Sequence, residues 1–112
     1  MKITRLALQN MYDCLAVLPP FDRFTLPLSH SIEFRVNQSK MAKGLYEPDP
    51  HQISISRIQH DSYGDVLMTL AHEMVHLALE RRGASDHSNH DADFNKLGAE
   101  VCDFWGWNFK EF

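Results

Sequence analysis

A pentapeptide in the second half of the chain, His72-Glu73-Met74-Val75-His76, constrains the fold more than any other feature of the sequence. Two histidines four residues apart stand above one another on one face of an α-helix, so both imidazoles can point at a single ion. The glutamate beside the first histidine can then reach a water that this ion holds. The pattern therefore predicts a helix that carries two zinc ligands, His72 and His76, and a general base, Glu73.

The residues around the pentapeptide have to support this interpretation. The chain has 7 histidines in 112 residues, and a random shuffle of its composition would contain the pattern in roughly 2% of cases. Asp61 and Ser62 offer N-cap oxygens, and Arg81–Gly83 suits a C-terminus, so a helix over about residues 63–82 is predicted. Apolar residues on two sides of this helix indicate that it is mostly buried. Buried histidines and a buried carboxylate need partners, and a metal ion satisfies them together.

A catalytic zinc site needs a third protein ligand and leaves its fourth position to water. Small, polar residues 83–90 predict a loop, after which Asn89 can cap a second helix that His90 opens. Five apolar residues follow His90 at helical spacing and would turn it toward the core: Phe94, Leu97, Val101, Phe104 and Trp105. His90 is therefore predicted as the third ligand. His87 is an alternative ligand or an outer partner, and Glu100, which does not share the His90 face, is a second alternative.

The rest of the chain predicts an α+β fold. Apolar spacing indicates an amphipathic helix over residues 3–18, which Pro19 and Pro20 end. Strands are predicted over residues 32–36, 41–47 and 53–58, with a proline-rich turn between the last two. The predicted order is helix, small antiparallel three-stranded sheet, HExxH helix and ligand-bearing helix, with the helices on one face of the sheet.

The composition fits one domain over residues 1–112, because a 44% hydrophobic content can bury a single core. Cys14 and Cys102 are too few for a disulfide framework and are predicted as small core residues in a reducing compartment. Polar residues interrupt the apolar stretch 6–18, so we expect a cytoplasmic protein with no signal peptide and no membrane partner. The net charge of -4 gives no dominant basic footprint. A local basic patch would consist of Lys40, Lys43, Arg81 and Arg82.

Three stretches of the sequence carry a family resemblance. The stretch Leu67–Ala78 holds HExxH after a leucine-rich approach, and in His90–Phe94 a histidine is followed four residues later by phenylalanine. Upstream, Gly44–Tyr46 and Gln52–Ser56 suit a strand pair just before the active helix. Over roughly residues 31–105, these features resemble the SprT-like metallopeptidases, which include the Spartan proteases acting on DNA–protein crosslinks.

The resemblance implies a zincin-like fold, a Zn²⁺ cofactor and a protein or peptide substrate, and it alone implies DNA as a possible partner. In two respects the sequence departs from the family. Asp91 follows the third histidine, where glycine is usual, and the chain has too few cysteines for the family's four-cysteine zinc ribbon. The chain is therefore expected to be a minimal, single-domain member. Its oligomeric state is not predicted.

The predicted mechanism assigns a proton transfer to Glu73, which takes the proton of a zinc-bound water and later returns it to the leaving amine. Candidates for a further oxyanion stabiliser are Tyr46, Tyr63 and His87. One strand among residues 41–56 is expected to be an exposed edge to which a substrate peptide adds as an extra strand. The competing hypothesis is a non-catalytic, zinc-stabilised binding module, in which a fourth side chain such as His87 or Asp86 closes the site.

Overall fold

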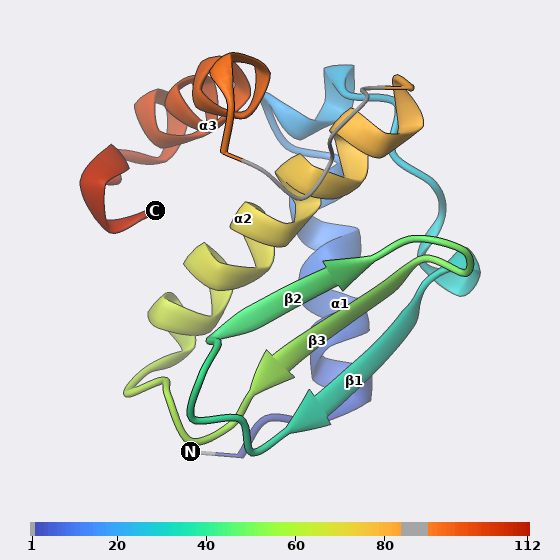
Figure 1. Cartoon of the computed structure of the whole chain (residues 1–112), viewed down its shortest axis with the longest axis vertical. Coiled ribbons are helices and arrows are strands. Elements are labelled where there is room, and N and C mark those ends of the chain that lie inside the picture. Colours follow the sequence, from blue (N-terminus) through green and yellow to red (C-terminus); the bar gives the residue numbers. More distant parts are fainter. Residues whose placement is uncertain (1, 84–89) are drawn as a thin grey trace.

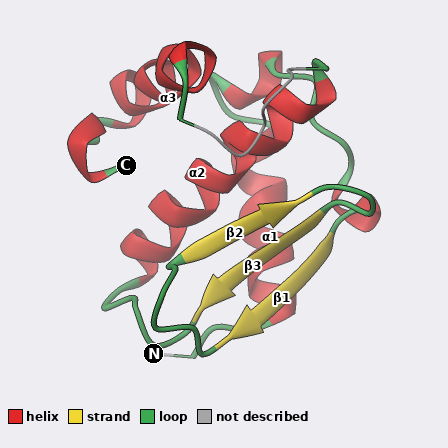
Figure 2. Ribbon diagram, viewed as in Figure 1, coloured by secondary structure: helices red, strands yellow, loops and turns green. Residues whose placement is uncertain are grey.

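Helix α2 (Tyr63–Arg81) runs through the centre of the molecule and carries the HExxH motif (Figure 1). The computed structural model describes residues 2–83 and 90–112. Helices and a small sheet make up an α+β fold, as predicted (Figure 2). Besides α2, the elements are α1 (Arg5–Ala16), β1 (Glu33–Asn37), β2 (Gly44–Glu47), β3 (Gln52–Ser56), α3 (Ala92–Trp105) and three short 3-10 helices (Phe21–Arg23, Ser29–Ser31 and Phe109–Glu111). The arrangement is consistent with a zincin-like layout.

The ends of α2 follow from local sequence signals. The Ser62 side chain accepts a hydrogen bond from the Asp65 N–H at 3.2 Å and caps the N-terminus. At the other end, Gly83 has a φ of +75°, the left-handed conformation that commonly ends a helix and that glycine adopts without strain. The predicted bounds of this helix are therefore confirmed to within one residue.

The sheet is mixed, so the prediction of an antiparallel sheet is wrong. The strand order is β1-β3-β2, with β3 parallel to β1 and antiparallel to β2. After β1 the chain passes to the outer strand β2, and β3 returns between the two (Figure 1). Alternation of apolar and polar residues marks a strand but encodes neither its neighbours nor its direction. Because β3 is central, Ser54 and Ser56 are buried as well as Ile53 and Ile55.

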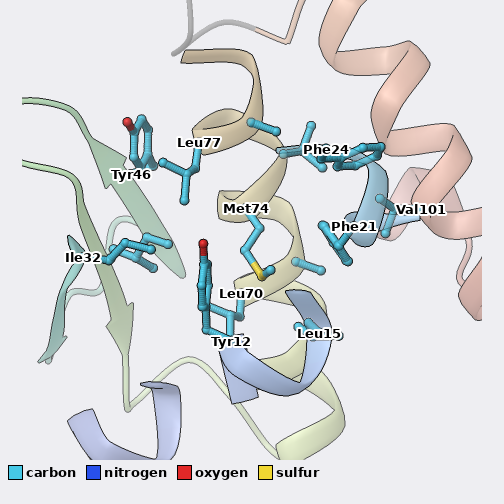
Figure 3. Packing of buried hydrophobic residues seen from close by; sticks show 14 of the residues in the cluster. Tyr12, Leu15, Phe21, Phe24, Ile32, Tyr46, Leu70, Met74, Leu77 and Val101 are labelled. Carbon is cyan, nitrogen blue, oxygen red and sulfur yellow. The ribbon is translucent and has the colours of Figure 1, made fainter. Parts of the chain in front are cut away.

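Helices α1 and α2 pack against the sheet and enclose the main core. Tyr12 of α1 meets Leu70 and Met74 of α2 in this layer (Figure 3), and all three side chains are at most 1% exposed. The predicted N-terminal helix is confirmed, although Cys14 on it is exposed rather than a core residue, whereas Cys102 is buried. Among the described residues, no helix combines the length and apolar character needed to cross a membrane.

Helix α3 begins two residues later than predicted, so His90 precedes the helix and does not open it. Asp91 is the N-cap and accepts a hydrogen bond from the Phe94 N–H at 3.1 Å. The predicted cap, Asn89, lies outside the described residues. Phe94, like Leu97 and Val101, is buried, but Phe104 is 55% exposed and its ring faces the Arg23 guanidinium. Phe104 lies at the margin of the apolar stripe, near the end of the helix.

Candidate metal centre

Three imidazoles meet between α2 and the start of α3. His72 and His76 extend from consecutive turns of α2, and His90 reaches them from the residue just before the Asp91 cap. The Nε2 atom of His90 lies 3.2 Å from Nε2 of His72 and 3.2 Å from Nε2 of His76. The three ligand atoms all lie within 4.8 Å of one another. The structure therefore brings together the three histidines that the sequence predicts as ligands.

The spacing of these nitrogens suits a tetrahedral ion. Two nitrogens bound at about 2.0–2.1 Å to one tetrahedral zinc ion lie roughly 3.3 Å apart. Two of the three nitrogen pairs in the cluster are close to that separation, at 3.2 Å. Neutral imidazole is the usual metal-binding form of histidine. Within residues 2–83 and 90–112 the donor set is three imidazoles, a set that also occurs in zinc enzymes.

The ring of Phe94 supports all three imidazoles. It stacks on His90 with 4.3 Å between ring centroids and lies 4.6 Å from His76 and 4.9 Å from His72. Phe94 is only 2% exposed, and the Asp91 cap fixes its turn of helix. Asp91 therefore has a local role: it starts α3 at the point that places Phe94 beside the three imidazoles.

The orientation of His72 is set by a hydrogen bond to Phe112. Nδ1–H of His72 donates a hydrogen bond to the main-chain oxygen of Phe112 at 2.7 Å. This bond leaves Nε2 as the unprotonated nitrogen that faces the cluster, the arrangement by which proteins commonly fix a ligating histidine. Burial, with a further contribution from the neighbouring imidazole of His76, lowers the pKa of His72 to about 4. The ring is therefore neutral at physiological pH.

Glu73 is buried beside the first histidine, with 5% of its surface exposed. Burial raises the pKa of its carboxyl to about 8, although a hydrogen bond from the main-chain N–H of Tyr46 opposes the shift. A carboxyl group whose pKa lies close to neutral pH can both accept and donate a proton. The environment of Glu73 is thus suited to the proton transfer that the sequence assigns to it.

Strand β2 lies close against α2 at Gly44. A Cβ atom at this position would lie 2.7 Å from Cγ2 of Thr69 and 3.0 Å from Oε2 of Glu73. Only glycine permits this approach without a shift of the neighbouring side chains. As a result, β2 lies alongside the cluster, and a hollow of about 250 Å³ opens between them. Its lining residues are Gly44, Leu45, Tyr46, His72, Glu73, His76 and His90.

Replacing Gly44 with alanine is expected to destabilise the metal-free protein by about 1–3 kcal/mol, the usual cost of overpacking. The added methyl group must displace the Thr69 side chain or the Glu73 carboxylate. Urea unfolding measures the change. Gly64→Ala is the matched control, because its Cβ would meet only Ser62 Oγ, at an ordinary 3.6 Å. Equal unfolding midpoints for Gly44→Ala and the wild type would contradict the close approach.

The remaining sequence candidates have hydrogen-bond or ion-pair partners outside the imidazole cluster or lie outside the described residues. Glu100, the alternative ligand, pairs with Arg23 at 2.8 Å and is not brought to the histidines. The Tyr46 hydroxyl bonds with His51 at 2.7 Å, and the Tyr63 hydroxyl donates to the main-chain oxygen of Lys2 at 2.9 Å. Each of these hydroxyls thus has a hydrogen-bond partner outside the cluster, and their role as oxyanion stabilisers stays a prediction. His87 and Asp86 lie outside the described residues.

Sequence analysis missed a buried hydrogen-bond chain behind Glu73. His60, 7% exposed, donates from Nδ1 to the main-chain oxygen of Ser56 at 2.6 Å, and its Nε2 shares a 2.8 Å hydrogen bond with the Thr69 hydroxyl. The chain links the end of β3 to the turn of α2 that precedes Glu73. A histidine between a strand and a helix gives no periodic signal, and Phe112 gives none either, because its contact with His72 spans 40 residues.

Comparison with known proteins agrees with the site. A search of curated proteins found no match to this chain. The model of the SprT-like family matches residues 18–108, which include the whole sheet, the HExxH helix and the histidine that precedes α3. Since the match covers most of the 112 residues, the chain belongs to the SprT-like family.

Proposed function

We propose that the protein is a zinc-dependent metallopeptidase that hydrolyses peptide bonds in protein substrates. The observation that carries this proposal is the convergence of the imidazoles of His72, His76 and His90 beside the buried carboxyl of Glu73. A purely structural zinc site has no need of such a carboxyl, since ionising a buried glutamate is costly. Membership of the SprT-like family supports the same activity.

The three histidines would hold the metal through Nε2, and bound zinc would lower the pKa of its water to about 7 and polarise the substrate carbonyl. Glu73 would accept the proton of the attacking water on its carboxylate and pass it to the leaving amine. The Phe112 oxygen keeps His72 in the tautomer that suits its role. The Tyr46 N–H donates a hydrogen bond to the Glu73 carboxylate and so helps to hold it beside β2.

Strand β2 supplies the edge along which a peptide would bind. The Ser56 N–H donates to the Lys43 oxygen, and hydrogen-bonded pairs alternate along an antiparallel ladder. In this register, Leu45 pairs with β3, so the main-chain groups of Gly44 and Tyr46 point to the outer edge, where the Tyr46 N–H donates to Glu73. A peptide that adds to this edge would pass over the hollow beside the histidines. The edge predicted within residues 41–56 is therefore assigned to β2.

Zinc dependence and coordination test the proposal. The zinc-loaded protein is expected to cleave a mixed peptide library, with the products identified by mass spectrometry, and chelation of zinc should abolish cleavage. X-ray absorption should find one zinc per chain with three imidazole nitrogens and a water oxygen. Four protein ligands and no cleavage would instead indicate the zinc-stabilised binding module and would overturn the proposal.

Peptide N-methylation tests strand addition. If the substrate pairs with β2, methylating every second main-chain nitrogen on one side of the scissile bond should lower kcat/KM about 10-fold per group, because each removes a hydrogen bond and leaves an acceptor unpaired. Methylation at the intervening positions, whose N–H groups face away from β2, is expected to have little effect. Equal losses at all positions would exclude pairing with this edge.

DNA as a partner stays a prediction of the resemblance. Two residues of the predicted basic patch, Arg81 and Arg82, lie at the C-terminal end of α2, and the Arg82 guanidinium lies over the Phe24 ring. Lys43 lies beside β2, on the rim of a pocket next to Glu73.

A further inference from the structure

A second pocket opens on the other side of His72 and Glu73, toward the N-terminal half of α2. It has a volume of about 200 Å³. Met68 and Thr69 of α2 line one side, Gly44 lies at its strand side, and Phe112 forms the opposite wall. We call it the Phe112 pocket. It shares His72 and Glu73 with the hollow beside the histidines, so a peptide lying along β2 would pass its entrance.

Met68 and Phe112 give the Phe112 pocket two apolar walls, Thr69, His72 and Glu73 add polar groups to its lining, and its rim is charged. Met68 and Phe112 are half-buried, while Lys43, Asp65 and Glu111 are exposed. The rim carries both signs of charge and is solvated, so it gives no strong preference for a charged group. A dry apolar cavity of about 150 Å³ is sufficient for benzene. The pocket therefore has room for one large apolar side chain.

The Phe112 wall is held in place from two sides. Its main-chain oxygen accepts the hydrogen bond from His72, and its ring stacks on the Phe94 ring with 6.1 Å between the ring centroids. Behind it, Gly98 of α3 forms a notch for the last turn of the chain: a Cβ there would lie 2.8 Å from the Phe109 ring and 3.3 Å from the Phe112 ring. Residues 109–112 lie beyond the stretch that the family model matches.

We propose that the Phe112 pocket binds an apolar side chain of the substrate next to the bond that is cut, and that Phe112 and Met68 determine this specificity. The proposal rests on the peptidase function proposed above. Leucine or phenylalanine at that position would bury apolar surface against both walls, whereas a glutamate or lysine would lose hydration that this lining of mixed charge replaces only in part. One methylene in such a pocket changes kcat/KM by about 10- to 200-fold.

Five peptides test the proposal. They differ only in the residue next to the scissile bond, which is alanine, leucine, phenylalanine, glutamate or lysine. The zinc-loaded wild type should favour leucine and phenylalanine over the other three at least 10-fold in kcat/KM. Met68→Lys should move the preference to glutamate. Phe112→Ala, which keeps the main-chain oxygen that binds His72, should reduce the ratio of kcat/KM for the leucine peptide to kcat/KM for the alanine peptide. Val17→Ala, at an exposed apolar residue of α1's C-cap, is the control.

Binding separates a failure of this inference from a failure of the proposed function. Zinc-loaded Glu73→Gln should bind the fluorescently labelled peptides in the same order of affinity without cutting them. If the wild type cleaves none of the peptides, the proposed function fails, and the affinity order alone decides on the pocket. The inference would be overturned if all five peptides had equal kcat/KM and equal affinity. It would also be overturned by a preference that neither Met68→Lys nor Phe112→Ala alters.

Discussion

Replacing Glu73 with glutamine is expected to lower peptide hydrolysis by about 10²–10⁴-fold, the contribution typical of a general base. Glutamine has nearly the same shape and can still accept the Tyr46 N–H through its amide oxygen, but it cannot take a proton from the attacking water. The imidazole cluster is unchanged, so the variant should still bind one zinc per chain. Steady-state kinetics and metal analysis of the same preparation measure both expectations.

Glu80→Gln is the matched control, since it removes a carboxylate from the same helix two turns away. It should retain the activity of the wild type. Full activity of Glu73→Gln would contradict the general-base role. If the variant has lost its zinc, its lower activity reports loss of the metal and not loss of the base.

Metal-free protein gives a second measure of the same substitution. Because burial raises the pKa of Glu73 from 4.5 to about 8, the folded protein holds this proton more tightly than the unfolded chain does. The resulting stability is present below about pH 4.5 and is lost as the pH rises through 8. Glu73→Gln carries no such proton, so its stability relative to the wild type should rise between pH 5 and about pH 8–9. Thermal unfolding at several pH values measures this difference.

The parts of the site that the sequence predicts are those set by local geometry. Four-residue spacing places His72 and His76 on one face, and the apolar stripe that runs from Phe94 to Val101 turns the start of α3 toward them. His90 lies beside the other two histidines, as predicted, although α3 begins after it. The reason is that stacking on the Phe94 ring, rather than the helix itself, aligns this imidazole. Helix ends are equally local, as the Ser62 cap and Gly83 illustrate.

The features that sequence reasoning missed depend on contacts between distant segments. The direction of β3 depends on how residues 38–43 carry the chain to the outer edge, and no alternation pattern records that path. The contact of Gly44 with α2 and the bond from His72 to Phe112 join residues that are far apart in the sequence. The sequence indicates Gly44 only as part of a strand pair. Its role in letting β2 lie against Thr69 of α2 depends on the lack of a Cβ atom, which only the structure shows.

Replacing His90 with alanine is expected to lower zinc affinity by more than about 100-fold, since loss of even an outer partner of a ligand typically costs 10- to 100-fold. His90 is exposed and precedes α3, so its removal should leave the metal-free fold intact, unlike the removal of buried His76. Competition with a chromophoric chelator measures the affinity. His30→Ala, at an exposed histidine outside the cluster, is the control.

Thermal unfolding separates loss of zinc from loss of fold in this variant. Zinc at 100 times its dissociation constant stabilises a protein by about 2.7 kcal/mol, and this shift should be present in the wild type and in His30→Ala but absent in His90→Ala. The variants should unfold at similar temperatures without metal. If His90→Ala keeps its zinc and His87→Ala loses it, the third ligand is His87, and the 3.2 Å approaches of His90 to the other two imidazoles do not represent coordination. If both single variants lose zinc, both histidines bind the metal, which would close the site and favour the binding module over the enzyme.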